Sequence, residues 1–240
     1  PAPLGAPLSV LYGGALVCRN ALMPEPVRAG VPVICVGNLT VGGTGKTPMV
    51  GWVVEVLKKA GRHPVILTRG YGGDEPTLLE RLGVPVVAEP DRVKGAALAK
   101  GKGADVLVMD DGFQHLRLAR DLDIVLVDAT DPWGGGHLLP WGRLREPREA
   151  LGRAQAVVIT RSDLATPEVL AGIRAEVARL APKALLAEAV HEPVGGEELQ
   201  GKKVLAVCGI GNPEAFRRTL ESLGAQVTFK VFPDHQRYTT

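Results

Sequence analysis

The sequence predicts an α/β fold with a mainly parallel sheet flanked by helices. Short runs in which every residue is apolar alternate along the chain with segments whose apolar residues recur at helical spacing. A strand that is apolar at every position is typical of a parallel sheet, because both of its faces are covered. The composition agrees with a folded globular chain, since 45% of the 240 residues are hydrophobic and 22% are charged.

The first expected element is an N-terminal amphipathic helix. The apolar stretch 8–18 is too short to cross a bilayer, which needs about 20 apolar residues, and no basic residue precedes it as in a signal peptide. We expect a helix that is either packed against the domain or placed at a membrane surface.

Strands and helices then alternate to the end of the chain. The β-branched run 31–36 ends at a glycine and predicts a buried strand, whereas 47–59 has apolar residues at helical spacing and stops before Gly61. The same reasoning predicts further strands at 65–68, 84–88, 106–109, 124–127, 157–160, 204–207 and 227–232. It predicts further helices at 77–82, 91–100, 167–180 and 214–223.

A polar, glycine-rich segment at 187–203 interrupts this alternation. We expect a domain boundary there, because boundaries fall in exposed polar segments with few contacts. The predicted organisation is a larger domain over residues 1–189, which includes the N-terminal helix, and a smaller α/β domain over 190–240.

Charge and cysteine content exclude several functions. The net charge of +2 lacks the basic excess of a dedicated nucleic-acid binder, so we expect no nucleic-acid partner. Three widely spaced cysteines predict neither a disulfide framework nor a cysteine-rich metal site, which fits a reducing compartment.

The strongest functional signal is a glycine-rich loop between the strand 31–36 and the helix 47–59. Glycines let backbone N–H groups approach phosphate oxygens, and the helix N-terminus adds partial positive charge. Lys46 would reach the β- and γ-phosphates, and the Thr47 hydroxyl would bind Mg²⁺. Thr40 stands where a strict P-loop has its first glycine, so the loop is a GGxGKT variant. The residues expected to bind nucleotide are Gly42, Gly43, Thr44, Gly45, Lys46 and Thr47.

A pair of acids at a strand end is the second signal. The apolar run 106–109 is followed by Asp110 and Asp111, which would repel each other unless a cation lay nearby. In enzymes with a phosphate-binding loop, an acid in this place lies on the Mg²⁺ side of the site. Gln114 and His115 follow and would present an amide and an imidazole at the same edge of the sheet.

Several weaker patterns leave their meaning open. Asp74 and Glu75, after a glycine turn, could accept a proton from a substrate hydroxyl, but acids in turns are more often structural. The pair Asp234–His235 follows the last predicted strand, and an isolated Asp–His pair is also more often structural. Arginines between 143 and 153 could bind anions, although neighbouring glutamates offset them. The sequence TRSD at 160–163 is similar to the TKxD base-reading motif of GTPases.

Six motifs in one order connect the chain to a known family. They are NLTVGGTGKTP at 38–48, RGYGG at 69–73, DDGFQH at 110–115, LREP at 144–147, GIGNP at 209–213 and FPDH at 232–235. In this combination the chain resembles the tetraacyldisaccharide 4'-kinases, the lipid A kinases of Gram-negative bacteria. The resemblance covers nearly the whole chain and implies a P-loop kinase fold for the first domain.

The resemblance implies an ATP- and Mg²⁺-dependent kinase of lipopolysaccharide biosynthesis. It would phosphorylate the 4'-hydroxyl of tetraacyldisaccharide 1-phosphate to form lipid IVA, as a peripheral enzyme on the cytoplasmic face of the inner membrane. The segment 8–23 would then lie at the membrane surface, and no obligate protein partner is expected. By analogy, Asp74 and His235 act together at the acceptor hydroxyl, with Lys46 on the phosphates. The implied metal ligands are Thr47, Asp110 and Asp111, and the implied substrate contacts are Glu75, Gln114, His115, Arg143, Arg145 and Glu146.

The chain departs from the family pattern in three places. Gly73 serves both the GYGG and the GDEP motif, which a variable segment usually separates, and Gln236 stands where a second histidine is common. The family also usually continues beyond the position of residue 240, so we expect the second domain to be incomplete. Two other classes stay open: a P-loop GTPase switch or metallochaperone-like NTPase, and a scaffold that binds nucleotide without catalysis.

Overall fold

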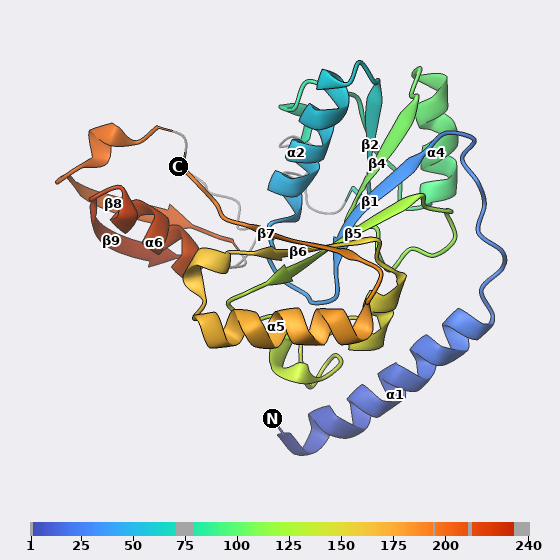
Figure 1. Ribbon diagram of the computed structural model, residues 1–240, viewed down its shortest axis with the longest axis horizontal. Helices are drawn as coiled ribbons and strands as arrows, with labels where there is room; N and C mark the ends of the chain where they lie inside the picture. The colour runs from blue at the N-terminus through green and yellow to red at the C-terminus, as the bar shows by residue number, and fades with distance from the viewer. Residues whose placement is uncertain (1, 71–78, 194, 211–212, 233–240) are drawn as a thin grey trace. The chain divides into compact units, whose positions relative to one another are not determined.

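The computed structural model describes residues 2–70, 79–193, 195–210 and 213–232 (Figure 1). The chain forms two compact units, residues 1–190 and 191–240. Each is built around its own parallel strands.

The first unit contains a seven-stranded sheet in the order β3-β2-β4-β1-β5-β6-β7, with every pair of neighbours parallel. β1 lies between β4 and β5, so the strand order runs in one direction from β1 towards β3 and in the other towards β7. Ligands of such sheets bind outside the carboxyl ends of the strands, where the strand order reverses. The strands are β1 (Val33–Asn38), β2 (Pro64–Thr68), β3 (Val86–Ala88), β4 (Val106–Asp110), β5 (Leu122–Asp128), β6 (Ala156–Thr160) and β7 (Leu185–Ala189).

Helices cover both faces of this sheet, as its apolar strands require (Figure 1). α2 (Lys46–Lys59) packs on one face through Val50, Val53 and Val54. α4 (Arg92–Gly101) and α5 (Pro167–Leu180) pack on the other. Side chains start both of these helices: Asp91 accepts from the Val93 N–H at 3.0 Å, and Thr166 caps α5 ahead of a proline.

One side of α1 (Ala2–Ala21) packs against the rest of the first unit, and its other side is exposed. Its inner side is tied by the Ser9 hydroxyl, which donates to the Leu138 carbonyl at 2.9 Å, and it buries Leu16. Its outer side exposes 69% of Leu11 and 68% of Val17. Among the helices of the described residues, none has the length and apolar character needed to span a bilayer.

The second unit is a small parallel βαβ arrangement. β8 (Lys203–Cys208) and β9 (Gln226–Val231) pair along their full length, and α6 (Pro213–Ser222) connects them. The helix packs on the pair through Phe216, whose ring centre lies 6.0 Å from that of Phe229.

The α/β class and the mainly parallel sheet are confirmed, but one strand was missed. β7 lies at the edge of the sheet, and its sequence LLAEA contains Glu188 and none of the β-branched residues that indicated the other strands. The segment 187–203, expected to contain a domain boundary, therefore begins inside the sheet. Of the helix expected at 77–82, residues 77 and 78 lie outside the described part of the chain.

Close packing at the end of β1 makes Gly37 a sensitive position. A Cβ atom there would lie 2.6 Å from Cβ of Phe113, which is itself fully buried. We expect Gly37→Ala to lower the free energy of unfolding by about 1–3 kcal/mol, because the core must move to admit the methyl group. Urea denaturation measures this change.

Gly172→Ala is the matched control. Gly172 lies inside α5 with nothing within 4 Å of its added Cβ, so the change should stabilise by about 0.5–1 kcal/mol. Equal effects of the two substitutions would contradict the packing argument.

Candidate functional site

The glycine-rich loop links the end of β1 to the start of α2. Gly42 and Gly45 have φ angles of 117° and 87°, which favour glycine. The Asn38 side-chain amide donates to the Thr44 hydroxyl at 2.9 Å and so connects the end of β1 to the far part of the loop. α2, which is described in full, has no side-chain cap and no acid in its first turn. Its first N–H groups and positive dipole end are therefore available to an anion.

Lys46 folds back over this loop. Its Nζ lies 3.4 Å from Asn38 Oδ1 and 3.5 Å from the Gly42 carbonyl oxygen, and 3.6 Å from a carboxylate oxygen of Asp111. The ammonium group thus lies between the loop and the end of β4. Thr47, the next residue, is exposed in the first turn of α2.

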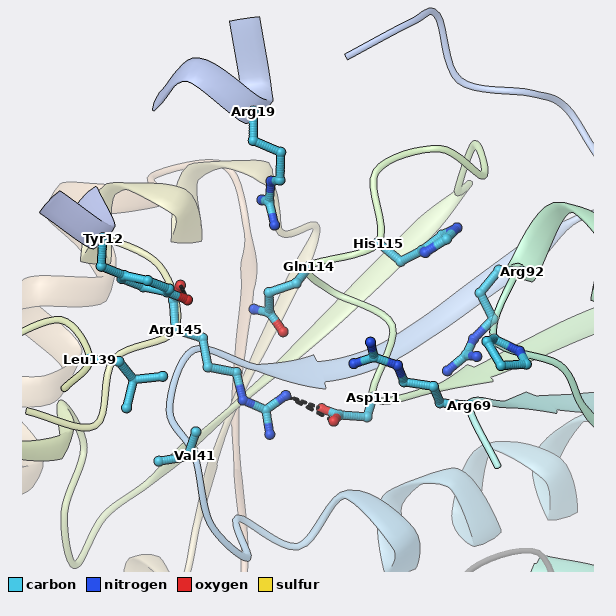
Figure 2. Close-up of a pocket in the computed structure, with 11 residues that line it drawn as sticks. Tyr12, Arg19, Val41, Arg69, Arg92, Asp111, Gln114, His115, Leu139 and Arg145 are labelled. Carbon is cyan, nitrogen blue, oxygen red and sulfur yellow. Dashed lines mark hydrogen bonds and ion pairs between the residues drawn. The ribbon is translucent and has the colours of Figure 1, made fainter. Parts of the chain in front are cut away.

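Asp111 connects the loop to a second cation. Nη1 of Arg145 lies 2.8 Å from both of its carboxylate oxygens (Figure 2). Burial raises the pKa of Asp111, but the charges of Lys46 and Arg145 outweigh it, so the pKa lies below its ordinary value. The backbone of Asp111 has a φ of 50°, a costly conformation that the two ion pairs hold in place.

The predicted metal ligands lie at one edge of the sheet. Asp110 ends β4 opposite Val36 of β1 and is buried, and Thr47 begins α2. Hydroxyl and carboxylate oxygens suit Mg²⁺, which takes its remaining ligands from phosphates and water. Within the described residues, no three His, Cys, Asp or Glu side chains gather as a metal site of their own. The donor set therefore fits a Mg²⁺ that arrives with a nucleotide, and the ligand roles remain predictions.

A pocket of about 480 Å³ lies beside Asp111 (Figure 2). Four arginines line it, and among its described lining residues Asp111 is the one carboxylate. The pocket is therefore suited to an anionic ligand. Its lining residues are Tyr12, Arg19, Val41, Arg69, Pro90, Arg92, Asp111, Gln114, His115, Leu139 and Arg145.

The ionisation of two lining residues reflects this positive charge. Burial lowers the pKa of Arg92, and the charge of Arg69 lowers it further. Burial and the charge of Arg92 lower the pKa of His115 to about 4. His115 is therefore a neutral imidazole near pH 7.

Two lining residues present polar atoms that lack partners. Gln114 donates from Nε2 to the Asn38 carbonyl at 2.9 Å, which fixes its side chain against the base of the loop. Its Oε1 and the Nε2 of His115 are buried and have no hydrogen-bond partner among the described residues. Buried polar atoms of this kind are costly unless a ligand satisfies them.

Of the three residues predicted from the segment 143–146, only Arg145 lines the pocket. Arg143 forms an ion pair with Asp131. Glu146 is 1% exposed and lies between Arg19 at 3.0 Å and Arg153 at 2.5 Å. The segment also pairs with the loop, since the Arg145 N–H donates to the Leu39 carbonyl at 2.7 Å.

Other functional residues could not be placed or were not foreseen. Asp74, Glu75 and His235 lie outside the described residues. Arg19 and Arg92 line the pocket from α1 and α4, and no local sequence signal singles them out. Arg69 directly follows a buried strand, and this strand-end position could have identified it.

The fold and the loop together define a P-loop nucleotide-binding protein. A family model described as tetraacyldisaccharide-1-P 4'-kinase (LpxK) matches residues 2–73 and 72–240. The chain belongs to this family, as its motifs indicated.

Individual relatives of the chain carry the same family name. The tetraacyldisaccharide 4'-kinase of Anaeromyxobacter sp. (strain K) is 44% identical over 286 residues, covering 100% of this chain and 76% of the relative. That of Syntrophus aciditrophicus (strain SB) is 41% identical over 278 residues, covering 96% and 74%. The crystal structure of LpxK from Aquifex aeolicus in complex with ATP superimposes with a TM-score of 0.73 at 33% identity, covering 96% of this chain and 81% of that one.

The lowered pKa of His115 gives a direct test of the pocket's charge. In an NMR titration of the imidazole, His115 should protonate near pH 4 rather than near 6.5. Because the unfolded chain binds this proton at higher pH, stability should fall as the pH drops from about 6.5 towards 4. Arg92→Gln should move the pKa part of the way back towards 6.5. Titration near 6.5 in the unmodified protein would refute the proposed environment.

Proposed function

We propose that this protein transfers the γ-phosphoryl group of ATP to the 4'-hydroxyl of tetraacyldisaccharide 1-phosphate, forming lipid IVA for lipid A. The observation that carries the proposal is the shared position of Asp111. One carboxylate contacts Lys46 of the phosphate-binding loop and Arg145 of the cationic pocket. A nucleotide site and a site for an anionic acceptor are thus adjacent, as phosphoryl transfer requires.

The nucleotide half of the reaction depends on positioned positive charge. Lys46 would leave Asp111 and bind the β- and γ-phosphates, while the N–H groups at the start of α2 receive the same anion. Thr47, Asp110 and Asp111 would hold Mg²⁺, which neutralises charge on the phosphate oxygens. Arg145 keeps Asp111 ionised and oriented when Lys46 moves away.

The acceptor half uses the pocket. A neutral His115 and the Gln114 Oε1 can accept hydrogen bonds from sugar hydroxyls, which would satisfy their buried atoms. Arg145 would bind the anionic part of the lipid, and Arg143 and Glu75 keep their predicted roles as substrate contacts. Glu146 is too buried for such a contact and would instead hold Arg19 at the pocket. We assign Asp74 as the proton acceptor for the 4'-hydroxyl and His235 as the residue that orients it.

A lipid substrate requires the enzyme to work at a membrane surface, and α1 could contact the substrate with one side and the membrane with the other. Tyr12 and Arg19 line the pocket from its inner side, while Leu11 and Val17 are exposed on the other. Insertion of the outer side among acyl chains would bring the pocket to the headgroup of a bilayer-embedded substrate. We therefore propose a peripheral location on the cytoplasmic face of the inner membrane.

The kinase reaction is tested with γ-labelled ATP and the disaccharide-1-phosphate lipid in detergent micelles. Lys46→Ala should lower kcat by roughly 100-fold or more, because charge on the transferred phosphoryl group loses its partner. Asp74→Ala should lower kcat by about 100-fold while ATP still binds. Lys58→Ala, which removes an exposed charge from the same helix α2, is the matched control and should act as the unmodified protein does.

Absence of labelled lipid from the unmodified protein, with ATP or GTP still hydrolysed, would refute the lipid kinase and favour the NTPase class. Preference for GTP over ATP in the same assay would point to a GTPase. Nucleotide binding without any transfer or hydrolysis would favour the scaffold.

The membrane proposal is tested by flotation with phosphatidylethanolamine–phosphatidylglycerol vesicles. Leu11→Glu with Val17→Glu should weaken binding by about tenfold or more, since two exposed apolar side chains lose their burial in lipid. Leu98→Glu places the same charge on another helix, α4, at a leucine that is 57% exposed, and should leave binding unchanged. Leu16 is unsuitable because it is 7% exposed and packs inward. Unaltered binding by the α1 variant would remove this helix from the membrane contact.

A further inference from the structure

The segment TRSD at 160–163 contacts the phosphate-binding loop through two consecutive residues. The Thr160 hydroxyl donates to the Thr44 carbonyl at 3.0 Å, and both side chains are buried. The Arg161 guanidinium donates to the Gly43 carbonyl at 2.9 Å. These contacts join parts of the chain that are more than 100 residues apart, and the nucleotide and lipid roles above do not use them.

The two bonds act on the peptide groups that would hold phosphate. In a trans peptide the carbonyl and the following N–H point in opposite directions. A Gly43 carbonyl held towards β6 therefore turns the Thr44 N–H away from it, and the held Thr44 carbonyl does the same for the Gly45 N–H. Both N–H groups are thus aimed to one side, and two carbonyl oxygens that would repel a phosphate are kept on the other.

Arg161 is itself held in a fixed position. Its guanidinium forms an ion pair with Asp128, and the side chains are only 11% and 9% exposed. Its backbone has a φ of 54°, an uncommon value for a residue with a side chain. Asp128 lies opposite Thr160 in the parallel register of β5 and β6, so the sheet sets the distance between the carboxylate and the loop.

The ion pair between Arg161 and Asp128 indicates that Arg161 does not itself bind phosphate. Asp128 neutralises Arg161, and among the described residues the other partner of its guanidinium is the Gly43 carbonyl. The guanidinium therefore contributes geometry instead of attraction. Asp163, the residue of the segment that a base-reading motif would use, is exposed.

We propose that Thr160 and Arg161 are positioning residues that pre-form the phosphate-binding loop by holding the Gly43 and Thr44 carbonyls away from the nucleotide. The inference rests on the proposed function, because it specifies how that nucleotide site is kept ready. The pair acts through the loop and does not touch the reacting atoms. Its loss is expected to weaken nucleotide binding without changing the affinity for lipid.

Binding of ADP and ATP with Mg²⁺ to the full chain, measured by calorimetry without lipid, tests the proposal. Thr160→Val keeps the shape and removes the donor, and it should raise the Kd roughly tenfold, the effect of one lost hydrogen bond. Thr160→Ser restores a hydroxyl and should recover most of the affinity. Arg161→Ala should raise the Kd at least as much. Arg161→Lys should recover only part of the affinity, because an ammonium group cannot bind Asp128 and the Gly43 carbonyl together as the planar guanidinium does.

Arg174→Ala is the matched control for Arg161. It removes the same charge from an exposed pair with Glu188 in the same unit, and the Kd should stay as it was. The thermal midpoint without nucleotide and the KM for lipid identify a general structural effect. A lowered midpoint together with an unchanged Kd in Thr160→Val and Arg161→Ala would overturn the inference. Failure of the unmodified protein to bind any nucleotide would overturn the proposed function as well.

Discussion

The close approach between the end of β1 and the turn after β4 is the constraint on which the site depends. Gly37 has no side chain, and Phe113 occupies the space that one would take. This contact seats the turn 111–115 beside the phosphate-binding loop. Asp111, Gln114 and His115 are carried by that turn, so their distances to Lys46 and Asn38 follow from one packing contact. A larger residue at position 37 would separate the two halves of the site.

Like charges gathered in one pocket are the main cost of this arrangement. Burial and the charge of Arg69 lower the pKa of Arg92, and burial and the charge of Arg92 lower the pKa of His115. Asp111 offsets only part of the charge, through Arg145 and Lys46. An anionic ligand would supply the missing negative charge. The pocket is therefore destabilising without its ligand, which is characteristic of binding sites rather than of structural ion pairs.

The arginines and the lysine around the site have different roles, which follow from how closely each is paired with a carboxylate. Arg161 is neutralised by Asp128 and holds a loop carbonyl, and Arg153 is bound to the buried Glu146 and lies over the Phe113 ring. Arg145 is shared between a carboxylate and the pocket. The contacts of Lys46 Nζ with described residues are long, at 3.4–3.6 Å, so it can exchange them for phosphate at little cost. The fixed arginines shape the site, and the loosely held lysine is available for chemistry.

The parallel α/β class, the phosphate-binding loop and the acids at the end of β4 could all be predicted from the sequence, because each depends on residues close together in the chain. Motif order also sufficed to identify the family. The edge strand β7 was missed because its leucines and alanines lack the β-branched character of the other strands. The sequence did not predict that Arg145 lines the pocket while Glu146 is buried, or that Arg19 and Arg92 also line it. Those choices follow from which side chains meet across helices and strands distant in sequence, and no local pattern carries that information.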